Sequence, residues 1–374
     1  MPGPVRLPEG RTALAWVFPV SGEPIRGGFI EVSGGTIAAV GYDQTLAVAS
    51  PVAVLPRPVN LHTHLELSAC RQPIGAGDPL ADWIPKVLRS RSGDAMESVR
   101  QGMAELARYG TAAALDIAQP GYPAADTADV PVIAAPELIG LDRGVAEERL
   151  NGILERSPSA ISPHAPYSLD PCVRDRAVAH AASESLLVTT HLAESPAERQ
   201  LLESGDGPLR EMLQTLGVWQ PGLFGGRTIA AELAAYGAAC RLIVAHGNDL
   251  RPSEFERLAR PGRAVAYCPR THAFFGYGRH PVLEMQSAGV AVGLGTDSRA
   301  SNPDLDVWNE VRFLIRHRPD IPPHVLVEMA TRVGAEALGL NSRFGTLEPG
   351  RSASVLVHPL AKPDATDPYE ALFG

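Results

Sequence analysis

Two histidines stand one residue apart at the end of an apolar run, in the segment RPVNLHTHLELSA (residues 57–69). Because side chains alternate between the two faces of a β-strand, His62 and His64 point the same way while Thr63 points away. Two imidazoles on one face can share a single metal ion. Histidines that merely pack or face solvent show the same spacing, so this motif alone leaves both interpretations open.

Polar residues follow other apolar runs in the same way. His164 follows SAISP, His191 ends LLVTTH, His246 ends RLIVAH and Asp297 follows VAVGLGT. If these runs are parallel strands of one barrel, their carboxyl ends lie together. Histidines and one carboxylate gathered there suit a divalent, zinc-like ion with an open position for water. A single buried histidine is more often a core residue, but six polar residues that all fall at strand ends favour a site.

The elements that must position these residues alternate regularly from about residue 55 onward. Eight short apolar runs are separated by longer stretches with helical periodicity. Strands buried on both faces are continuously apolar, and β/α alternation favours a parallel sheet, so we predict a (β/α)8 barrel. Residues 1–55 and 346–374 contain short strands broken by glycines and turns. They predict a small β-sandwich domain formed from both termini, with residues 56–345 as the catalytic barrel.

Composition narrows the class of protein. The chain has 374 residues, 45% of them hydrophobic, and a net charge of -9. It lacks a Lys/Arg-rich block, so a nucleic-acid partner is not expected. No apolar run approaches the roughly 18 residues needed to cross a membrane, and the start does not resemble a signal peptide, so we expect a cytoplasmic protein. The four cysteines are scattered without a CxxC pair, which predicts neither a disulfide framework nor a structural zinc cluster.

An ordered set of motifs covers nearly the whole chain. It comprises VNLHTHLELS, SPHAPYSL, THLAES, VAHGND, YCPRTHAFFGYGRHPV, GLGTDSRASNPDLD and the closing GTLEPGRSASVLV. This set resembles the amidohydrolase superfamily, in its branch of nucleobase and nucleoside aminohydrolases and related chlorohydrolases. The resemblance implies that His62, His64, His191 and Asp297 ligate a metal, while His246 contacts the water or the leaving group.

The lysine content bears on the number of metal ions. Many members of the superfamily hold two metals bridged by a carboxylated lysine on the fourth strand, whereas lysine occurs here only at Lys86 and Lys362. We therefore expect one divalent ion, zinc first, although such ligands also accept iron, manganese or nickel. His164 takes the fourth-strand position instead, where similar enzymes use an imidazole to contact substrate.

Glu194 follows His191 by three residues, which places a carboxyl group just past a strand end. A divalent ion can lower the pKa of its water to roughly 7, and a nearby carboxyl group that does not bind the ion can then carry protons to a ring nitrogen and to a departing amine. Asp297 and His246 would orient and deprotonate the water. The alternative for Glu194 is a solvated residue at a helix start, where a carboxylate is favoured anyway.

Substrate contacts are predicted mainly from the resemblance. Glu66 stands where adenosine-deaminase-like barrels contact a ribose hydroxyl, with a rim salt bridge as the alternative. Trp83 lies with other aromatics near the predicted mouth and would stack on a ring. Arg279 is one of several arginines in barrel-top connections that would bind a carboxylate. His272 lies where relatives contact substrate, although the chain has Thr271-His272 where relatives usually show Ser-Asn.

The motifs HTHLELS, HAPYSL and HLAES are similar to those of aminodeoxyfutalosine deaminases of the futalosine route to menaquinone. We therefore expect a small nucleoside-like substrate, first 6-aminodeoxyfutalosine, which joins an adenine nucleoside to a carboxyphenyl ketone. The alternatives are an S-adenosylhomocysteine, adenosine or guanine deaminase, a triazine chlorohydrolase, or a non-catalytic metal-binding barrel. Relatives are often dimers, so the resemblance allows a homodimer.

Overall fold

The computed structural model describes residues 3–46, 51–91, 94–119 and 130–374. Its main feature is an eight-stranded parallel sheet whose strands follow each other in chain order, from β8 to β15. The strands are β8 (Val59–Thr63), β9 (Ala113–Ala118), β10 (Val132–Leu138), β11 (Ala160–Pro163), β12 (Leu187–Leu192), β13 (Arg241–His246), β14 (Arg263–Tyr267) and β15 (Ala291–Leu294). A parallel bridge between Thr63 and Asp297 joins the first and last strands, so the sheet closes into the predicted (β/α)8 barrel.

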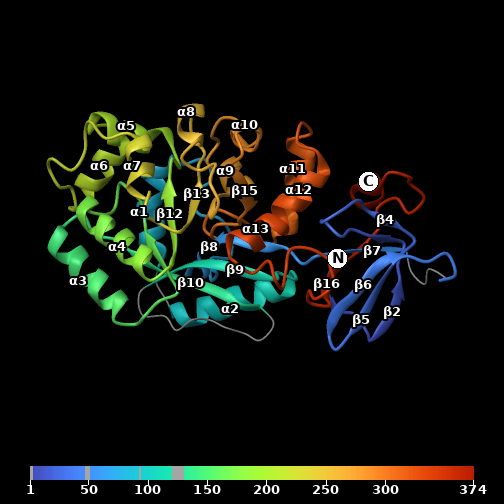
Figure 1. Ribbon diagram of the computed structural model, residues 1–374. Coiled ribbons are helices and arrows are strands. Elements are labelled where there is room, and N and C mark those ends of the chain that lie inside the picture. The colour runs from blue at the N-terminus through green and yellow to red at the C-terminus, as the bar shows by residue number, and fades with distance from the viewer. Residues whose placement is uncertain (1–2, 47–50, 92–93, 120–129) are drawn as a thin grey trace.

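Helices surround this barrel (Figure 1). They are α1 (Leu80–Ser90), α2 (Ala95–Arg108), α3 (Arg143–Leu154), α4 (Pro171–Ser183), α5 (Pro196–Ser204), α6 (Pro208–Thr215), α7 (Ile229–Ala235), α8 (Pro252–Phe255), α9 (Pro269–Phe274), α10 (Val282–Ser287), α11 (Val307–His317), α12 (Pro323–Ala330) and α13 (Arg332–Ala337). Among the described residues, none of the helices is both long and apolar enough to cross a membrane.

The stretch from His324 to Leu340, which the sequence presents as one helical segment, is divided in the structure. α12 and α13 meet at Thr331, whose backbone leaves the helical region with φ -129° and ψ -83°. The Thr331 hydroxyl donates to the carbonyl of Val327 at 2.6 Å. This local hydrogen bond competes with the helix ladder and accompanies the break.

The interior of the barrel is apolar at its amino-terminal end. The first residues of several strands, among them Val59, Ala113 and Leu187, share a core with Ala335 of α13 and with Phe344. α13 therefore covers the amino-terminal ends of the strands. The polar residues gather at the opposite, carboxyl-terminal ends, which is where barrels of this kind carry their sites.

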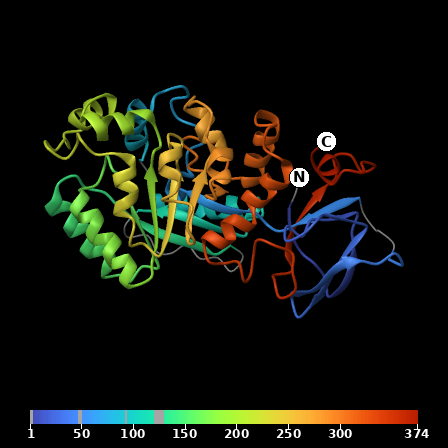
Figure 2. The same cartoon turned by 45° about the horizontal axis from the view of Figure 1, so that its top comes forward.

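A second body of β-structure is built from both ends of the chain, and both termini lie beside it (Figures 1 and 2). One sheet has the order β1-β16-β7-β3-β4 and the other β2-β5-β6. The strands are β1 (Gly3–Arg6), β2 (Gly10–Ala13), β3 (Trp16–Val17), β4 (Ile25–Arg26), β5 (Gly28–Ser33), β6 (Thr36–Tyr42), β7 (Val52–Leu55) and β16 (Ser354–Pro359), and the chain ends with α14 (Pro368–Phe373).

The two sheets of this β-structure share one apolar core. Ile30 and Ile37 from the three-stranded sheet pack with Val17, Val54 and Val355 from the five-stranded sheet. β16 lies between β1 and β7, so the carboxyl-terminal strand completes a sheet begun by the amino-terminal residues. The fold class is therefore confirmed, whereas the division of the chain after residues 55 and 345 stays a prediction.

Candidate metal centre and active site

Four histidine rings and one carboxylate meet at the carboxyl-terminal ends of the barrel strands. His62 lies in β8, His64 follows it, His191 and His246 lie at the ends of β12 and β13, and Asp297 comes three residues after β15. The ring of His62 is central, with centroids 5.0 Å from His64, 4.9 Å from His191 and 5.1 Å from His246. Asp297 Oδ1 lies 3.7 Å from His62 Nε2 and 3.6 Å from His64 Nε2. All five residues are buried.

The donor atoms of this cluster fit a cation. Nδ1 of His191 lies 3.1 Å from the carbonyl of His164, which makes Nδ1 the protonated nitrogen and leaves Nε2 with a lone pair. That Nε2 lies 3.2 Å from Nε2 of His64. Neither ring nitrogen of His62 has a hydrogen-bond partner among the described residues, although both are buried. Buried polar atoms rarely stay unpaired, so convergent lone pairs here point to a bound ion.

The protonation states of His62 and His191 also favour a metal site. Burial and the neighbouring imidazoles lower the pKa of His62 and of His191 well below their ordinary value, so both rings are neutral, as ligation requires. His64 differs: burial opposes its charge, but Glu66 and Asp297 outweigh that effect and raise its pKa to about 9. A cation and this proton would compete for the same ring.

Three non-glycine residues at the site adopt the left-handed backbone conformation. These are Ala193 with φ 52°, His246 with φ 70° and Asp297 with φ 57°. Such a conformation costs roughly 1–2 kcal/mol per residue, and it persists only where the surrounding structure enforces it. Its recurrence at the ends of three strands indicates a site held in a fixed geometry.

Glu194 lies over the histidines without joining the cluster of donor atoms. Its Oε1 is 3.6 Å from Nε2 of His246, and its Oε2 accepts a hydrogen bond from the hydroxyl of Tyr167 at 3.2 Å. Burial raises the pKa of Glu194, and the charge of Asp297 adds to this effect. A carboxyl group with a raised pKa beside a metal site is suited to act as a general acid.

The segment that carries Glu194 is fixed by the start of α5. Ser195 caps this helix by accepting a hydrogen bond from the backbone N–H of Glu198 at 3.3 Å, and Pro196 occupies its first turn. The carboxylate of Glu198 in turn accepts the backbone N–H of Glu194 at 2.8 Å. The sequence HLAESPAE thus ends a strand, places Glu194 and starts a helix within a few residues.

A cavity of about 550 Å³ opens beside these groups. His64, His164, His191, Glu194, His246 and Asp297 line its inner end. Its wall is apolar, from Trp83, Ile84 and Val87 of α1 and from Met212 and Leu213 of α6. Cavities of this size hold small organic ligands, and an apolar wall with a few polar groups is their usual lining.

The structure brings most of the predicted residues together. The donor atoms of the predicted ligands and of His246 form two close groups that share His62, one with His191 and His246 and the other with His64 and Asp297. Glu194, Trp83 and His164 line the cavity beside them. Nδ1 of His164 lies 2.7 Å from Oγ of Ser168, and burial lowers the pKa of His164 to about 3, so its ring is neutral. The chemical roles assigned to these residues stay predictions.

Three predicted substrate contacts are not among the residues that line the cavity. Arg279 is exposed and pairs with Asp320 at 2.8 Å, and it is not among the residues that line the cavity. His272 is buried beside Tyr267, with ring centroids 5.8 Å apart. Glu66 pairs with Arg91 at 3.1 Å, which is the salt bridge that the sequence left open as its alternative role.

Sequence reasoning missed three charged residues. Asp116 in β9 accepts the backbone N–H of Leu65 at 2.8 Å, and Glu137 in β10 lies 3.5 Å from Nε2 of His164. Burial and the charge of Glu66 raise the pKa of Asp116 to about 7. A carboxylate inside a wholly apolar run, as in TAAALDIA and VIAAPEL, is the signal that marks both. Arg149 of α3 also lines the cavity, and nothing in the helical pattern distinguishes it.

Comparison with known proteins agrees with this geometry. The profile of the Amidohydrolase family matches residues 53–374. This chain belongs to that family. An aminodeoxyfutalosine deaminase of Deinococcus radiodurans is 30% identical over 369 residues, which cover 85% of this chain and 82% of the relative. A 5-methylthioadenosine/S-adenosylhomocysteine deaminase of Desulforudis audaxviator is 31% identical over 396 residues, with 93% and 84% covered.

A solved structure shows the same fold. Helicobacter pylori aminofutalosine deaminase, in complex with methylthio-coformycin, superposes with a TM-score of 0.77 at 18% identity, over 94% of this chain and 92% of that one. The family resemblance predicted from the motifs is therefore confirmed, and with it a hydrolytic enzyme of the amidohydrolase type.

Proposed function

We propose that the protein is a metal-dependent hydrolytic deaminase of an adenine-type nucleoside, and that it converts 6-aminodeoxyfutalosine to futalosine. The observation that carries the proposal is the position of Glu194. Its buried carboxyl group lies 3.6 Å from His246 and faces the cavity beside the histidine cluster. A deaminase needs such a proton carrier, because the amine must be protonated before it can leave.

The residues that would hold the metal are His62, His64, His191 and Asp297. When bound, a divalent cation supplies Lewis acidity, which lowers the pKa of water to about 7 and makes a nucleophile available at neutral pH. The absence of lysine from the end of β11, where His164 stands, supports a single ion. Imidazole and carboxylate ligands suit zinc best among the common ions, so zinc is our first candidate.

The side chains of the protein then divide the proton transfers. Glu194 in its acid form donates a proton to the ring nitrogen beside the amidine carbon as a water oxygen adds to that carbon. His246 accepts a proton from the attacking water. The deprotonated Glu194 then takes the remaining proton of the added hydroxyl group and delivers it to the exocyclic nitrogen, so that the C=O bond forms, the C–N bond breaks and ammonia leaves. The proton held by His246 returns to Glu194, whose Oε1 lies 3.6 Å away. Tyr167, which donates to Oε2 of Glu194, holds the carboxyl group in place during both transfers.

The cavity supports a substrate larger than adenosine. Apolar side chains from three separate segments reach its outer rim and are exposed to solvent, namely Leu88, Val145, Leu216 and Val218. Apolar surface around a cavity mouth favours a ligand with an apolar substituent. An aryl group on the sugar would cover this rim and would leave the adenine ring free to reach Glu194.

Arg149 supports a carboxylate on that substituent. It lines the cavity, donates Nη1–H to the carbonyl of Ile139 at 2.6 Å, and has no carboxylate partner among the described residues. Arg91 also lines the cavity but is already paired with Glu66. A guanidinium group without a counter-charge is a suitable partner for an incoming carboxylate.

A second candidate is the deamination of 5′-methylthioadenosine or S-adenosylhomocysteine, because a relative named for those activities matches as closely as the aminodeoxyfutalosine deaminase does. Ammonia release from 6-aminodeoxyfutalosine, S-adenosylhomocysteine, adenosine and guanine separates these substrates. We expect the highest kcat/KM for 6-aminodeoxyfutalosine. A higher value for S-adenosylhomocysteine would select the second candidate, and no ammonia from any substrate would contradict a deaminase.

A further inference from the structure

The two carboxylate oxygens of Asp297 have different surroundings. Oδ1 faces the histidines, while Oδ2 accepts a hydrogen bond from Ser301 Oγ at 3.1 Å. The hydroxyl of Thr271 lies 3.0 Å from that of Ser301. When Ser301 donates its only hydrogen to Asp297, Thr271 is the donor to Ser301, and the carbonyl of Thr296, at 3.5 Å, is the more distant alternative acceptor for Thr271. The carbonyl of Ser298, at 3.4 Å, is the more distant alternative acceptor for Ser301.

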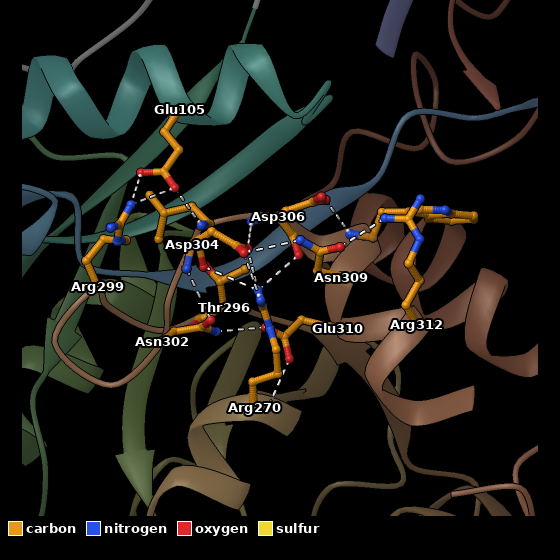
Figure 3. Close-up of polar contacts among 12 residues, drawn as sticks. Glu105, Arg270, Thr296, Arg299, Asn302, Asp304, Asp306, Asn309, Glu310 and Arg312 are labelled. Atoms are coloured by element: carbon orange, nitrogen blue, oxygen red, sulfur yellow. Dashed lines mark hydrogen bonds and ion pairs between the residues drawn. The ribbon is translucent and has the colours of Figure 1, made fainter. Parts of the chain in front are cut away.

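The backbone before Asp297 is held by a second route (Figure 3). The side-chain nitrogen of Asn302 donates to the carbonyl of Thr296 and to Oε1 of Glu310, each at 2.7 Å. The carbonyl of Thr296 belongs to the peptide unit that leads into Asp297. Asn302 therefore fixes the orientation of the peptide from which the Asp297 side chain projects.

Arg270 of α9 anchors this second route. It binds Glu310 through Nε at 2.7 Å and through its backbone N–H at 2.9 Å, and it binds Asp304 through Nη2 at 2.6 Å. Figure 3 shows the carboxylates of Glu310 and Asp304 on the guanidinium group. Glu310 is wholly buried, so this ion pair is shielded from solvent and from salt.

Both routes start from adjacent residues, Arg270 and Thr271, and end on Asp297. Arg270 fixes the main chain before Asp297 through Glu310 and Asn302. Thr271 fixes the side chain of Asp297 through Ser301. Asp297 has a positive φ, which costs conformational free energy unless neighbouring contacts enforce it. The segment SRASNPDLD (residues 298–306), which has no part in the proposed proton transfers, thus helps to hold Asp297 in this conformation.

We propose that Ser301 and Thr271 are positioning residues for Asp297, which present its Oδ1 to the metal site and prevent the carboxylate from rotating. The inference rests on the metal site of the proposed function. Outer partners of metal ligands typically contribute 10–100-fold to metal affinity. We therefore expect Ser301→Ala to weaken zinc binding by about 10–100-fold, and Thr271→Val, which leaves Ser301 in place, to weaken it in the same direction.

Matched controls are present in the same barrel. Ser162 Oγ and Thr189 Oγ1 are buried hydroxyls that lack a hydrogen-bond partner among the described residues. Ser162→Ala and Thr189→Val therefore remove the same atoms without touching Asp297. The zinc dissociation constant is measured by competition with a chromophoric chelator, and the unfolding temperature of each chelated variant shows whether the metal-free fold is intact.

The inference is supported if Ser301→Ala loses at least about tenfold in zinc affinity relative to Ser162→Ala while the two chelated variants unfold at similar temperatures. A smaller loss, or an equal loss in the control, would overturn it. If Ser301→Ala does not fold, Thr271→Val against Thr189→Val decides by the same criterion. Failure of the unaltered protein to bind zinc would instead overturn the proposed function, and this inference with it.

Discussion

Oε1 of Glu194 lies 3.6 Å from Nε2 of His246, inside a cavity lined by both residues. Glu194 projects from the start of α5 and His246 from the end of β13, so the pair joins two barrel segments that are distant in sequence. One member is a carboxyl group whose pKa is raised by burial, and the other is an imidazole beside the proposed metal ligands. Together they offer a proton donor and a proton acceptor on one side of the cavity.

Glu194→Gln should retain its metal and lose at least about a hundredfold in kcat, the usual lower contribution of general acid–base catalysis. Glutamine keeps the size and one oxygen of the side chain but cannot carry the proton. Zinc content and ammonia release, measured on the same preparation, check this prediction. Glu211→Gln on α6 is the control. Full turnover in Glu194→Gln would remove this residue from the mechanism.

Tyr167→Phe should lower kcat by up to about tenfold, because a hydrogen bond to a neutral group contributes roughly 0.5–1.5 kcal/mol. The substitution removes the donor to Oε2 of Glu194. That donor favours the charged form, so its loss should move the alkaline fall in activity to higher pH. Tyr236→Phe, which removes a buried hydroxyl bonded to Thr190, is the control. A pH profile identical to that of the unaltered enzyme would show that Tyr167 does not act on Glu194.

Arg149→Met should lower kcat/KM for 6-aminodeoxyfutalosine by about 10–100-fold, the contribution expected of a charge-assisted hydrogen bond, and should leave adenosine unaffected. Steady-state kinetics with the two nucleosides measure this selectivity directly. Arg156, an exposed arginine just after α3, does not line the cavity, so Arg156→Met is the control. Equal losses for both substrates would mean that Arg149 does not bind the carboxylate.

The free energy of unfolding of the metal-free protein should depend on pH through the titration of Glu198. Burial, with the charge of Glu194, raises the pKa of this carboxyl group from 4.5 to about 8. Between these values the folded state binds more protons than the unfolded state, so the contribution of Glu198 to stability falls as pH rises from about 4.5 to about 8.

Glu198→Gln removes this titration. The free energy of unfolding of the chelated protein, measured in urea from pH 5 to pH 8, should fall with pH in the unaltered chain relative to the variant, by up to about 1.4 kcal/mol per pH unit. Glu211→Gln should follow the unaltered chain. Parallel curves for the unaltered chain and Glu198→Gln would show that Glu198 is ionised in the folded state.

The barrel and its proposed metal ligands were predictable from sequence because both depend on strand pattern. β8 and β12 are buried along their whole length, and the apolar residues Val59, Leu61, Leu187 and Val188 mark them as strands. His62 and His191 then interrupt that pattern at the strand ends. A ligand set of this kind is positioned by the strands themselves, which the pattern locates.

The positions of residues well outside the strands could not be predicted from the sequence pattern. Arg279 and His272 both follow β14, and their orientation depends on how α9 and the next loop pack. That packing directs Arg279 toward Asp320 and encloses His272 beside Tyr267. Arg149 was missed because only the packing of α3 beside the cavity distinguishes it from other surface arginines. These placements depend on tertiary contacts between segments, which periodicity does not encode.

Zinc titration of the chelated protein, with ammonia release from 6-aminodeoxyfutalosine followed at each step, tests the central claim most directly. The account predicts that activity rises in proportion to added zinc and reaches its plateau at about one equivalent, the stoichiometry of a site with three protein ligands or more around one ion. Zinc binding at that stoichiometry without ammonia release from this or any other adenine nucleoside would contradict it.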